Sequence, residues 1–266
     1  VTGGALNVPR SEHAGSGTQT AALSFGGRNP VEGQTETYNG TAWTSVNNMN
    51  NARAQLMGSG TQTSTLASGG EPALTVTETW NGTNWTEVSD LNTGKYASGA
   101  AGVSNTSSLV FGGRTPPYTT TTESWDGSSW TEVNDMNTAR GYLGGTGTKT
   151  AALAFAGRIA PGVTELWNGT NWTEVNDMNT VRMKLAGAGV TTSALAFGGT
   201  NGSKTGATEA WNGSSWTTVG TMNIARNLFG GGAGANNTSA LAFGGPPATT
   251  ATEEWTDPGI ITKTLT

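Results

Sequence analysis

Short apolar alternations recur along the chain, and each is followed by a pair of small residues. Residues 152–155 (Ala-Leu-Ala-Phe) precede Ala-Gly, and residues 194–197 (Ala-Leu-Ala-Phe) precede Gly-Gly. Runs of this length that end at glycine are too short for helices and indicate β-strands. A Gly/Ala-rich run, such as residues 144–147 or 186–189, comes before each of them. We interpret this run as another strand, so crowded that larger side chains would not fit.

Two more strands follow in each unit, and residues 78–88 (ETWNGTNWTEV) show their pattern. One strand ends at Trp80 and the next begins near Trp85. Between them lies Asn-Gly, and other units have Asn-Gly or Asp-Gly at the same place. These dipeptides are preferred in type I′ turns, in which both central residues have positive φ. The pattern therefore predicts a tight hairpin with a type I′ turn, and each unit reads as four strands, a to d.

The unit recurs six times. Its first aromatic residues lie 42 to 45 positions apart: Tyr38, Trp80, Trp125, Trp167, Trp211 and Trp255. A fixed period of this size indicates a repeat protein. Four strands per unit and no helical period predict an all-β fold, a six-bladed β-propeller of four-stranded antiparallel blades in one domain, residues 1–266. The expected blades span roughly residues 10–49, 53–91, 95–136, 140–178, 182–222 and 226–266.

The two ends of the chain are expected to close the ring. Ile260 stands five residues after Trp255, where the other copies carry tryptophan, so residues 260–265 are predicted to form the outer strand of the last blade. Residues 6–10 are in register with residues 49–53, so residues 1–9 enter where the last blade ends. Residues 1–4 and 260–264 then either lie side by side at the edge of the last blade or compete for the same place there.

The order of these signals resembles the kelch repeat. Gly-Gly follows an apolar strand (Phe111-Gly112-Gly113), an aromatic residue and a tryptophan come next, and a basic residue opens the following unit. The resemblance covers nearly the whole chain, although only four residues separate the two aromatic positions here. The near-identical Asn/Thr/Trp-rich copies also resemble kelch-like proteins of marine bacteriophages and environmental viruses, which implies a place on a virion or outside a cell.

Composition restricts the chemistry. The 18 acidic and 13 basic residues are dispersed, which disfavours nucleic-acid binding. There is no cysteine and one histidine, His13, so we expect no metal site and no cofactor; a copper site of the galactose oxidase kind would need several imidazoles. No apolar run approaches the roughly 18 residues of a membrane span.

The repeated aromatic residues could stack on sugars or pack between blades, and we assign them mainly to packing. The Glu that opens strand c and the basic residue that opens strand a start at the same end of a blade. We expect two rings of structural ion pairs, because six symmetric carboxylates make a poor acid/base constellation. The rings contain Glu36, Glu78, Glu123, Glu165, Glu209 and Glu253, with Arg10, Arg53, Lys95, Arg140, Arg182 and Arg226.

The loops between strands b and c differ in length and character while the strands hardly change. Variation of this kind in repeat proteins often marks the binding face, although tolerant surface loops would look the same. The candidate binding residues are Arg28, Arg114, Tyr118, Arg158, Asn201 and Lys204. We therefore expect a non-enzymatic adhesion module that recognises a surface glycan or protein. The alternatives are an architectural subunit that binds other copies of itself and, third, a galactose-oxidase-like or glycosidase-like enzyme.

Overall fold

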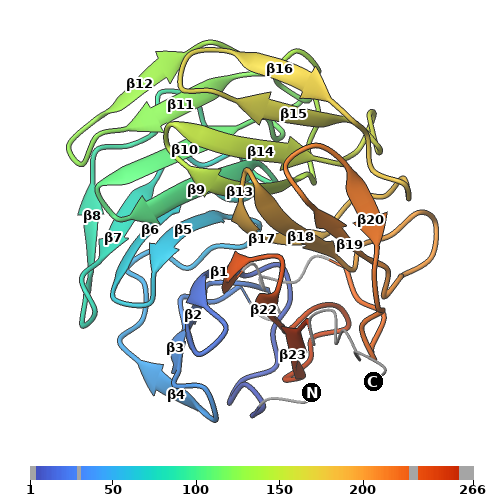
Figure 1. Cartoon of the computed structure of the whole chain (residues 1–266). Helices are drawn as coiled ribbons and strands as arrows, with labels where there is room; N and C mark the ends of the chain where they lie inside the picture. The colour runs from blue at the N-terminus through green and yellow to red at the C-terminus, as the bar shows by residue number, and fades with distance from the viewer. Residues whose placement is uncertain (1–3, 29–30, 228–232, 258–266) are drawn as a thin grey trace, which may run out of the picture.

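The computed structural model describes residues 4–28, 31–227 and 233–257, and within them the chain forms six antiparallel sheets arranged as a β-propeller (Figure 1). Five blades have four strands each, in the order in which they follow along the chain. They are β1 (Ala14–Thr18), β2 (Ala21–Phe25), β3 (Thr35–Tyr38) and β4 (Trp43–Val46); β5 (Met57–Thr61), β6 (Ser64–Ser68), β7 (Thr77–Trp80) and β8 (Trp85–Val88); β9 (Gly99–Ser104), β10 (Ser107–Phe111), β11 (Thr122–Trp125) and β12 (Trp130–Val133); β13 (Gly144–Thr148), β14 (Ala151–Phe155), β15 (Thr164–Trp167) and β16 (Trp172–Val175); and β17 (Ala186–Val190), β18 (Ser193–Phe197), β19 (Thr208–Trp211) and β20 (Trp216–Thr218). The sixth blade has three strands among the described residues: β21 (Ala233–Asn236), β22 (Ser239–Phe243) and β23 (Thr252–Thr256).

The first strand of each blade lies nearest the middle of the ring, where it contacts the first strands of the two neighbouring blades (Figure 1). The crowding predicted for these strands is present. A Cβ atom on Gly58 would come within 2.7 Å of the Phe25 ring, and one on Gly99 within 2.3 Å of the Phe111 ring. The small residues of the inner strands therefore allow the aromatic residue that ends each second strand to pack beside them.

The hairpins between the third and fourth strands are confirmed, but the predicted type I′ turn is wrong. The outermost aligned pair in the fourth blade is Trp167 and Trp172. Gly169 has a φ of 94°, whereas Asn168 is not among the residues with positive φ. Instead, the Asn168 side-chain oxygen accepts hydrogen bonds from the backbone N–H groups of Thr170 and Asn171, both 2.9 Å long. The side chain of asparagine, rather than its tolerance of positive φ, closes this turn.

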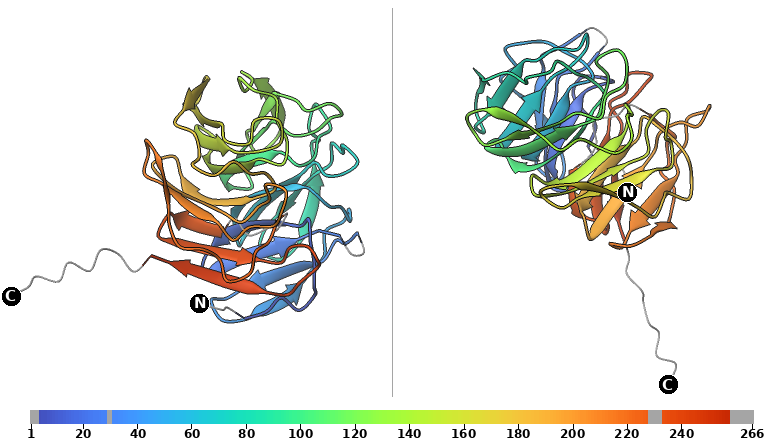
Figure 2. Two further views of the ribbon diagram at one scale, coloured as in Figure 1. Left: turned by 90° about the vertical axis from the view of Figure 1, so that its right-hand side faces the viewer. Right: turned by 90° about the horizontal axis from the view of Figure 1, so that it is seen from above.

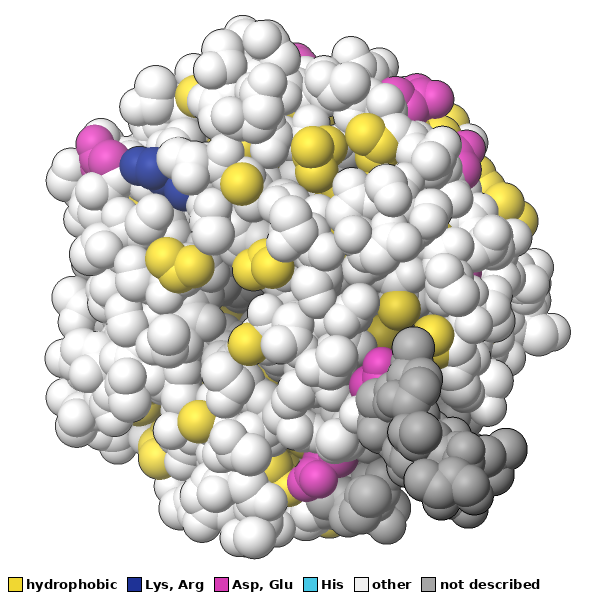
Figure 3. Space-filling view, in the orientation of Figure 1, with side chains coloured by type: hydrophobic (Ala, Val, Ile, Leu, Met, Phe, Trp, Pro, Cys, Tyr) yellow, Lys and Arg dark blue, Asp and Glu magenta, His cyan; other side chains and the backbone are white. Residues whose placement is uncertain are grey.

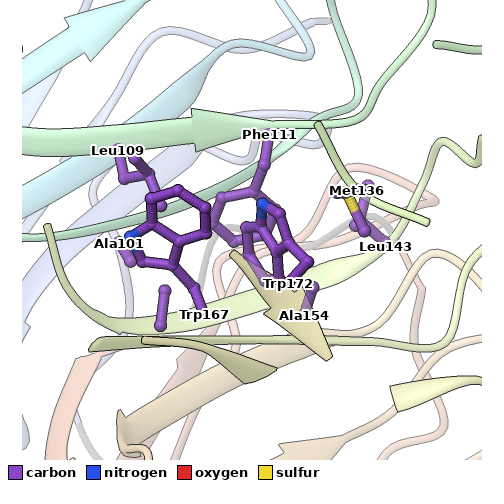
Figure 4. Packing of buried hydrophobic residues seen from close by; sticks show 9 residues of the cluster. Ala101, Leu109, Phe111, Met136, Leu143, Ala154, Trp167 and Trp172 are labelled. Carbon is purple, nitrogen blue, oxygen red and sulfur yellow. The ribbon is translucent and has the colours of Figure 1, made fainter. Parts of the chain in front are cut away.

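The tryptophans pack between blades, as the sequence predicted. Trp172 of β16 lies beside Trp167 of its own blade and against Phe111 of the preceding blade, with ring centres 5.4 and 4.8 Å apart (Figure 4). Its indole N–H donates to the Thr122 hydroxyl of that preceding blade over 3.1 Å. Each such residue thus contributes a large apolar area and a satisfied polar group to a blade interface.

The first and sixth blades lie side by side and close the ring (Figure 2). The Leu6 N–H donates to Thr250 O over 2.9 Å, which matches the bond from Met49 to Gly33 O in the first blade. The N-terminal segment therefore enters where the last blade ends, as expected. The outer strand predicted at residues 260–265 lies outside the described residues, and so does the expectation that residues 1–4 and 260–264 lie side by side or compete, since only Gly4 of these is described.

No helix in the part of the chain that the structure describes has the length and apolar character needed to cross a membrane.

Candidate binding face

One end of the propeller carries all the loops that vary between blades. The second strand of each blade ends there at its small-residue pair, and the first strand begins there after the linker from the preceding blade. Isolated backbone bridges join the two segments, for example between Ser11 and Arg28 and between Tyr96 and Arg114. We call this end, formed by the b–c loops and the interblade linkers, the loop face.

The ion pairs expected from the sequence lie beneath the loop face. All six pairs form, and both partners are almost completely buried in each: Arg10–Glu36, Arg53–Glu78, Lys95–Glu123, Arg140–Glu165, Arg182–Glu209 and Arg226–Glu253. The Glu78 carboxylate also accepts hydrogen bonds from the backbone and side chain of Asn50, 2.8 and 2.9 Å long. Burial lowers the pKa of Arg53, while the Glu78 carboxylate opposes this change. These groups therefore fix the interblade linkers in place.

A series of backbone hydrogen bonds, which we call the axial ring, joins the first five blades near the axis at the loop face, and the sequence analysis missed it. Five non-glycine residues with φ between 52° and 58° occupy the same position in successive blades: Glu12, Gln55, Ala97, Tyr142 and Lys184. Each after the first donates its N–H to the carbonyl of the one before, over 2.7 to 3.0 Å. The sequence does mark these positions. Each lies two residues after the basic residue of an ion pair, and the residue type there differs in all five blades.

The side chains of this axial ring line a cavity of ≈120 Å³ together with His13 and the leucines that directly precede the inner strands, Leu56, Leu143 and Leu185. His13 is buried beside the Phe243 ring, with ring centres 5.5 Å apart. Burial lowers its pKa well below the ordinary value, and the nearby Arg10 and Arg226 charges lower it further. The imidazole is therefore neutral at the bottom of this hollow.

Three of the four tyrosines gather at the loop face with two cations, and we call this group the tyrosine cluster: Tyr96, Arg114, Tyr118, Tyr142 and Lys184. The Arg114 guanidinium carbon lies 5.7 Å from the Tyr96 ring centre and 6.0 Å from that of Tyr118. The Lys184 ammonium lies 5.0 Å from the Tyr142 ring centre. Burial raises the pKa of Tyr142, while its hydrogen bond with Arg114 opposes that change. The cluster combines aromatic faces with positive charge, and two of its members, Tyr142 and Lys184, line the cavity.

Arg28, another predicted binding residue, is already paired with acids. Its side chain lies 2.8 Å from Glu12 Oε2 and also forms an ion pair with Glu71 of the second blade. Gln55 Nε2 donates to the same two carboxylates over 2.9 and 3.2 Å. In this part of the loop face the charge of Arg28 is therefore already paired, within a polar network of one cation and two carboxylates.

The remaining predicted residues lie on the next two blades. Arg158 is exposed on the b–c loop of the fourth blade, beside the exposed apolar residue Ile159. Asn201 and Lys204 are exposed on the fifth, where the Lys204 ammonium donates to Pro246 O of the sixth blade over 2.6 Å. The structure thus brings Arg114 and Tyr118 together in one cluster and leaves the other candidates on separate loops.

Away from the loop face, exposed carboxylates lie on the outer strands, for example Glu87, Glu132 and Glu174. On the face shown in Figure 3, hydrophobic side chains lie in small separate groups, and Lys or Arg gathers in one place only. Within residues 4–28, 31–227 and 233–257, no group of three or more His, Asp or Glu residues could hold a metal ion.

The fold and this face define the class of the protein, a six-bladed β-propeller whose variable residues collect at one end. Comparison with known protein families finds no matching family model, and comparison with curated proteins finds no similar protein.

Proposed function

We propose that this protein is a non-enzymatic binding module whose loop face recognises a glycan or a protein on a surface. The observation that carries the proposal is the tyrosine cluster, in which Arg114 lies beside the Tyr96 and Tyr118 rings and two other members, Tyr142 and Lys184, line the cavity. Tyrosine supplies a large contact area with few rotatable bonds, and both tyrosine and arginine are enriched at the centres of interfaces. Arg114 and Tyr118 come from the b–c loop of the third blade, whereas Tyr96, Tyr142 and Lys184 come from interblade linkers.

The backbone beneath the cluster supports a rigid binding surface. Tyr142 and Lys184 belong to the hydrogen-bonded axial ring, and Tyr96 and Arg114 exchange backbone bonds of 3.2 and 2.8 Å. A site held in this way loses little conformational entropy when a partner docks. The kelch-like repeat pattern and its resemblance to bacteriophage proteins further favour a place outside the cell or on a virion.

The test is a binding screen against glycan and surface-protein arrays with the double variant Arg114→Ala/Tyr118→Ala. Loss of two central aromatic and cationic contacts is expected to weaken binding about 30-fold or more, since each such residue contributes roughly 1–2 kcal/mol at an interface. Lys149→Ala, in the hairpin between β13 and β14 at the opposite end, is the matched control and should bind as the wild type does. Binding that survives in the double variant would refute the assignment to this cluster.

An architectural subunit is the second candidate function. What favours it is the resemblance of the Asn/Thr/Trp-rich copies to kelch-like proteins of bacteriophages, which is compatible with a subunit that decorates a virion. Electron microscopy of native particles or appendages would distinguish an assembled subunit from a free adhesin.

A further inference from the structure

The basic residues of this chain divide into those that are paired with a carboxylate and those that are not. Seven form ion pairs, namely the six beneath the loop face and Arg28. The others in the described part of the chain form no ion pair with an acidic side chain: Arg114, Lys149, Arg158, Lys184 and Lys204. All 18 acidic side chains of the sequence lie within the described residues, so their acidic partners are absent from the chain itself. All of these cations except Lys149 lie on the loop face.

Charge is distributed unevenly over the b–c loops. Those of the first two blades contain the acids Glu32 and Glu71. Those of the third, fourth and fifth blades each contain one cation and no Asp or Glu: residues 114–121, 158–163 and 200–207. Asp135, which follows β12, is hydrogen-bonded to the first of these loops through the Thr120 hydroxyl and pairs with no cation. This side of the loop face therefore attracts an anionic group, although the whole chain has a net charge of -5.

Within the tyrosine cluster, two of these cations are held by aromatic rings rather than by opposite charges. The Arg114 guanidinium lies near two tyrosine rings and hydrogen-bonds to the Tyr142 hydroxyl, and the Lys184 ammonium lies over the Tyr142 ring. The Tyr118 ring packs directly on the backbone, since a Cβ atom on Gly141 would come within 2.8 Å of it. A tyrosine ring attracts a cation but remains neutral. The two half-buried cations are therefore ordered while their charge stays available to a ligand.

The surroundings of the cluster favour a saccharide over an acidic protein segment. The centre of a protein interface is apolar and depleted of charge. On the loop face, however, the exposed large hydrophobic residues occur singly on four different loops or linkers: Val31, Ile159, Val181 and Ile224. The b–c loop that carries Arg114 and Tyr118 instead contains four threonines. Hydroxyl groups beside aromatic rings and a few charges suit a polar ligand with an apolar ring face.

We propose that the tyrosine cluster binds an acidic saccharide, a sugar ring that carries a carboxylate, and this inference rests on the function proposed for the loop face. The carboxylate accepts hydrogen bonds from the Arg114 guanidinium, whose planar fork matches it, and from the Lys184 ammonium. The sugar ring lies against the accessible parts of Tyr118 and Tyr142. The cations of the fourth and fifth b–c loops extend the positive surface for further acidic sugars of a polymer.

The probes are galacturonate and galactose, which share a pyranose ring and differ in the carboxylate. Each is titrated into the full chain carrying isotopically labelled tyrosine, and the four tyrosine signals are followed by NMR. We expect galacturonate, and N-acetylneuraminate as a second acidic sugar, to shift the signals of Tyr96, Tyr118 and Tyr142 saturably. Tyr38, buried in the first blade, is the internal reference and should not move. Galactose should bind about tenfold or more weakly, because it cannot form the charged hydrogen bonds.

A third probe separates a sugar from a protein segment as the source of the carboxylate. It is the N-acetyl amide of glutamate, which has a side-chain carboxylate and no sugar ring. We expect it to bind about threefold or more weakly than galacturonate, because it lacks the ring that packs on the tyrosines.

Two variants copy residues that other blades hold at the same positions, so the fold accommodates them. Lys184→Gln introduces the residue type of Gln55 in the axial ring, and Arg114→Thr introduces that of Thr200, which forms the matching backbone bridge in the fifth blade. Each should weaken galacturonate binding about tenfold or more. Lys149→Gln removes an equal charge at the opposite end and should leave the affinity unchanged.

Three results would overturn the inference, and they differ in what they mean for the proposed function. Equal affinity for galactose and galacturonate would show that the carboxylate is not recognised, while the loop face would remain a sugar-binding surface. Equal affinity for the glutamate derivative would identify an acidic protein segment as the partner, again on the same face. No shift of the three tyrosines with either acidic sugar would remove the acidic saccharide, and the proposed function would fall with it only if the array ligands also bound the Arg114→Ala/Tyr118→Ala variant normally.

Discussion

Removal of the negative charge from one buried ion pair should strongly destabilise the propeller, and Glu78→Gln tests this with little change in shape. Arg53 and Glu78 are 1% and 0% exposed. Loss of one partner from a buried pair leaves an uncompensated charge, which costs about 3–5 kcal/mol. Glu78 also accepts from Asn50 at Oε2 and from the Asn51 N–H and Arg53 at Oε1, and the single oxygen of the new amide cannot replace both acceptors. We therefore expect the free energy of unfolding to fall by about 4 kcal/mol, a large part of the roughly 5–15 kcal/mol that is typical of folded domains.

Urea denaturation followed by tryptophan fluorescence measures this difference. The matched control is Glu87→Gln, because Glu87 lies directly opposite Glu78 on the neighbouring strand but is exposed. Its one side-chain hydrogen bond, from Asn51, is at the surface and should be worth less than about 1 kcal/mol. If the two variants lost the same free energy within about 1 kcal/mol, the buried pair would not be an important source of stability and the reasoning would fail.

The third blade offers an internal comparison for the same position. There Lys95 replaces the arginine, and its ammonium lies 3.1 Å from Glu123 Oε1. Arg53→Lys should therefore keep the charge pair and lose the 2.9 Å bond to Gly69 O, a smaller loss of about 1–3 kcal/mol. We therefore expect Glu78→Gln to be the least stable of the three proteins, Arg53→Lys to be intermediate and the wild type to be the most stable.

Three further predictions concern single residues. Burial holds the pKa of His13 below its ordinary value near 6.5, so as the pH falls the imidazole takes up its proton in the unfolded chain before it does so in the folded one. The free energy of unfolding should therefore be independent of this histidine above pH 6.5 and fall by up to about 1.4 kcal/mol per pH unit below it. Denaturation measured from pH 8 to 5 should show this slope in the wild type and not in His13→Gln. Thr122→Val leaves the buried Trp172 indole N–H without its acceptor and should cost about 1–3 kcal/mol by chemical denaturation; an unchanged midpoint would contradict the role of the hydroxyl. Gly169→Ala places a side chain at a φ of 94° and should lower stability by about 1 kcal/mol or more in a thermal melt, whereas a raised melting temperature would show that the turn relaxes freely.

The strands, the ion pairs and the packing role of the tryptophans could be predicted from the sequence, because each repeat contains the residues that determine them. The strands follow from apolar alternation and the small-residue pairs, and the ion pairs follow because Glu78 and Arg53 open strands at the same end of one blade. The tryptophans were assigned to packing because they recur at one position, and Trp172 does bridge two blades. These inferences needed only the period and the geometry of an antiparallel sheet.

The loop face could be predicted only in part, because its contacts join blades that are far apart in the chain. Arg28 pairs with Glu71, 43 residues away, and no local pattern shows that this charge is already matched. Tyr142 and Lys184 join the tyrosine cluster from linkers, whereas the sequence analysis looked only at the b–c loops. The turn type was wrong for a different reason, since the Asn168 side chain supplies hydrogen bonds that a preference for positive φ does not describe.

The most direct test of the proposed function is hydrogen–deuterium exchange of the full chain with and without the best ligand from the arrays. Our account predicts that the ligand protects backbone amides at the loop face, in the segments that carry Tyr96, Arg114, Tyr118 and Tyr142. Protection confined to the opposite end, at the hairpins around Lys149 and Gly169, would contradict it.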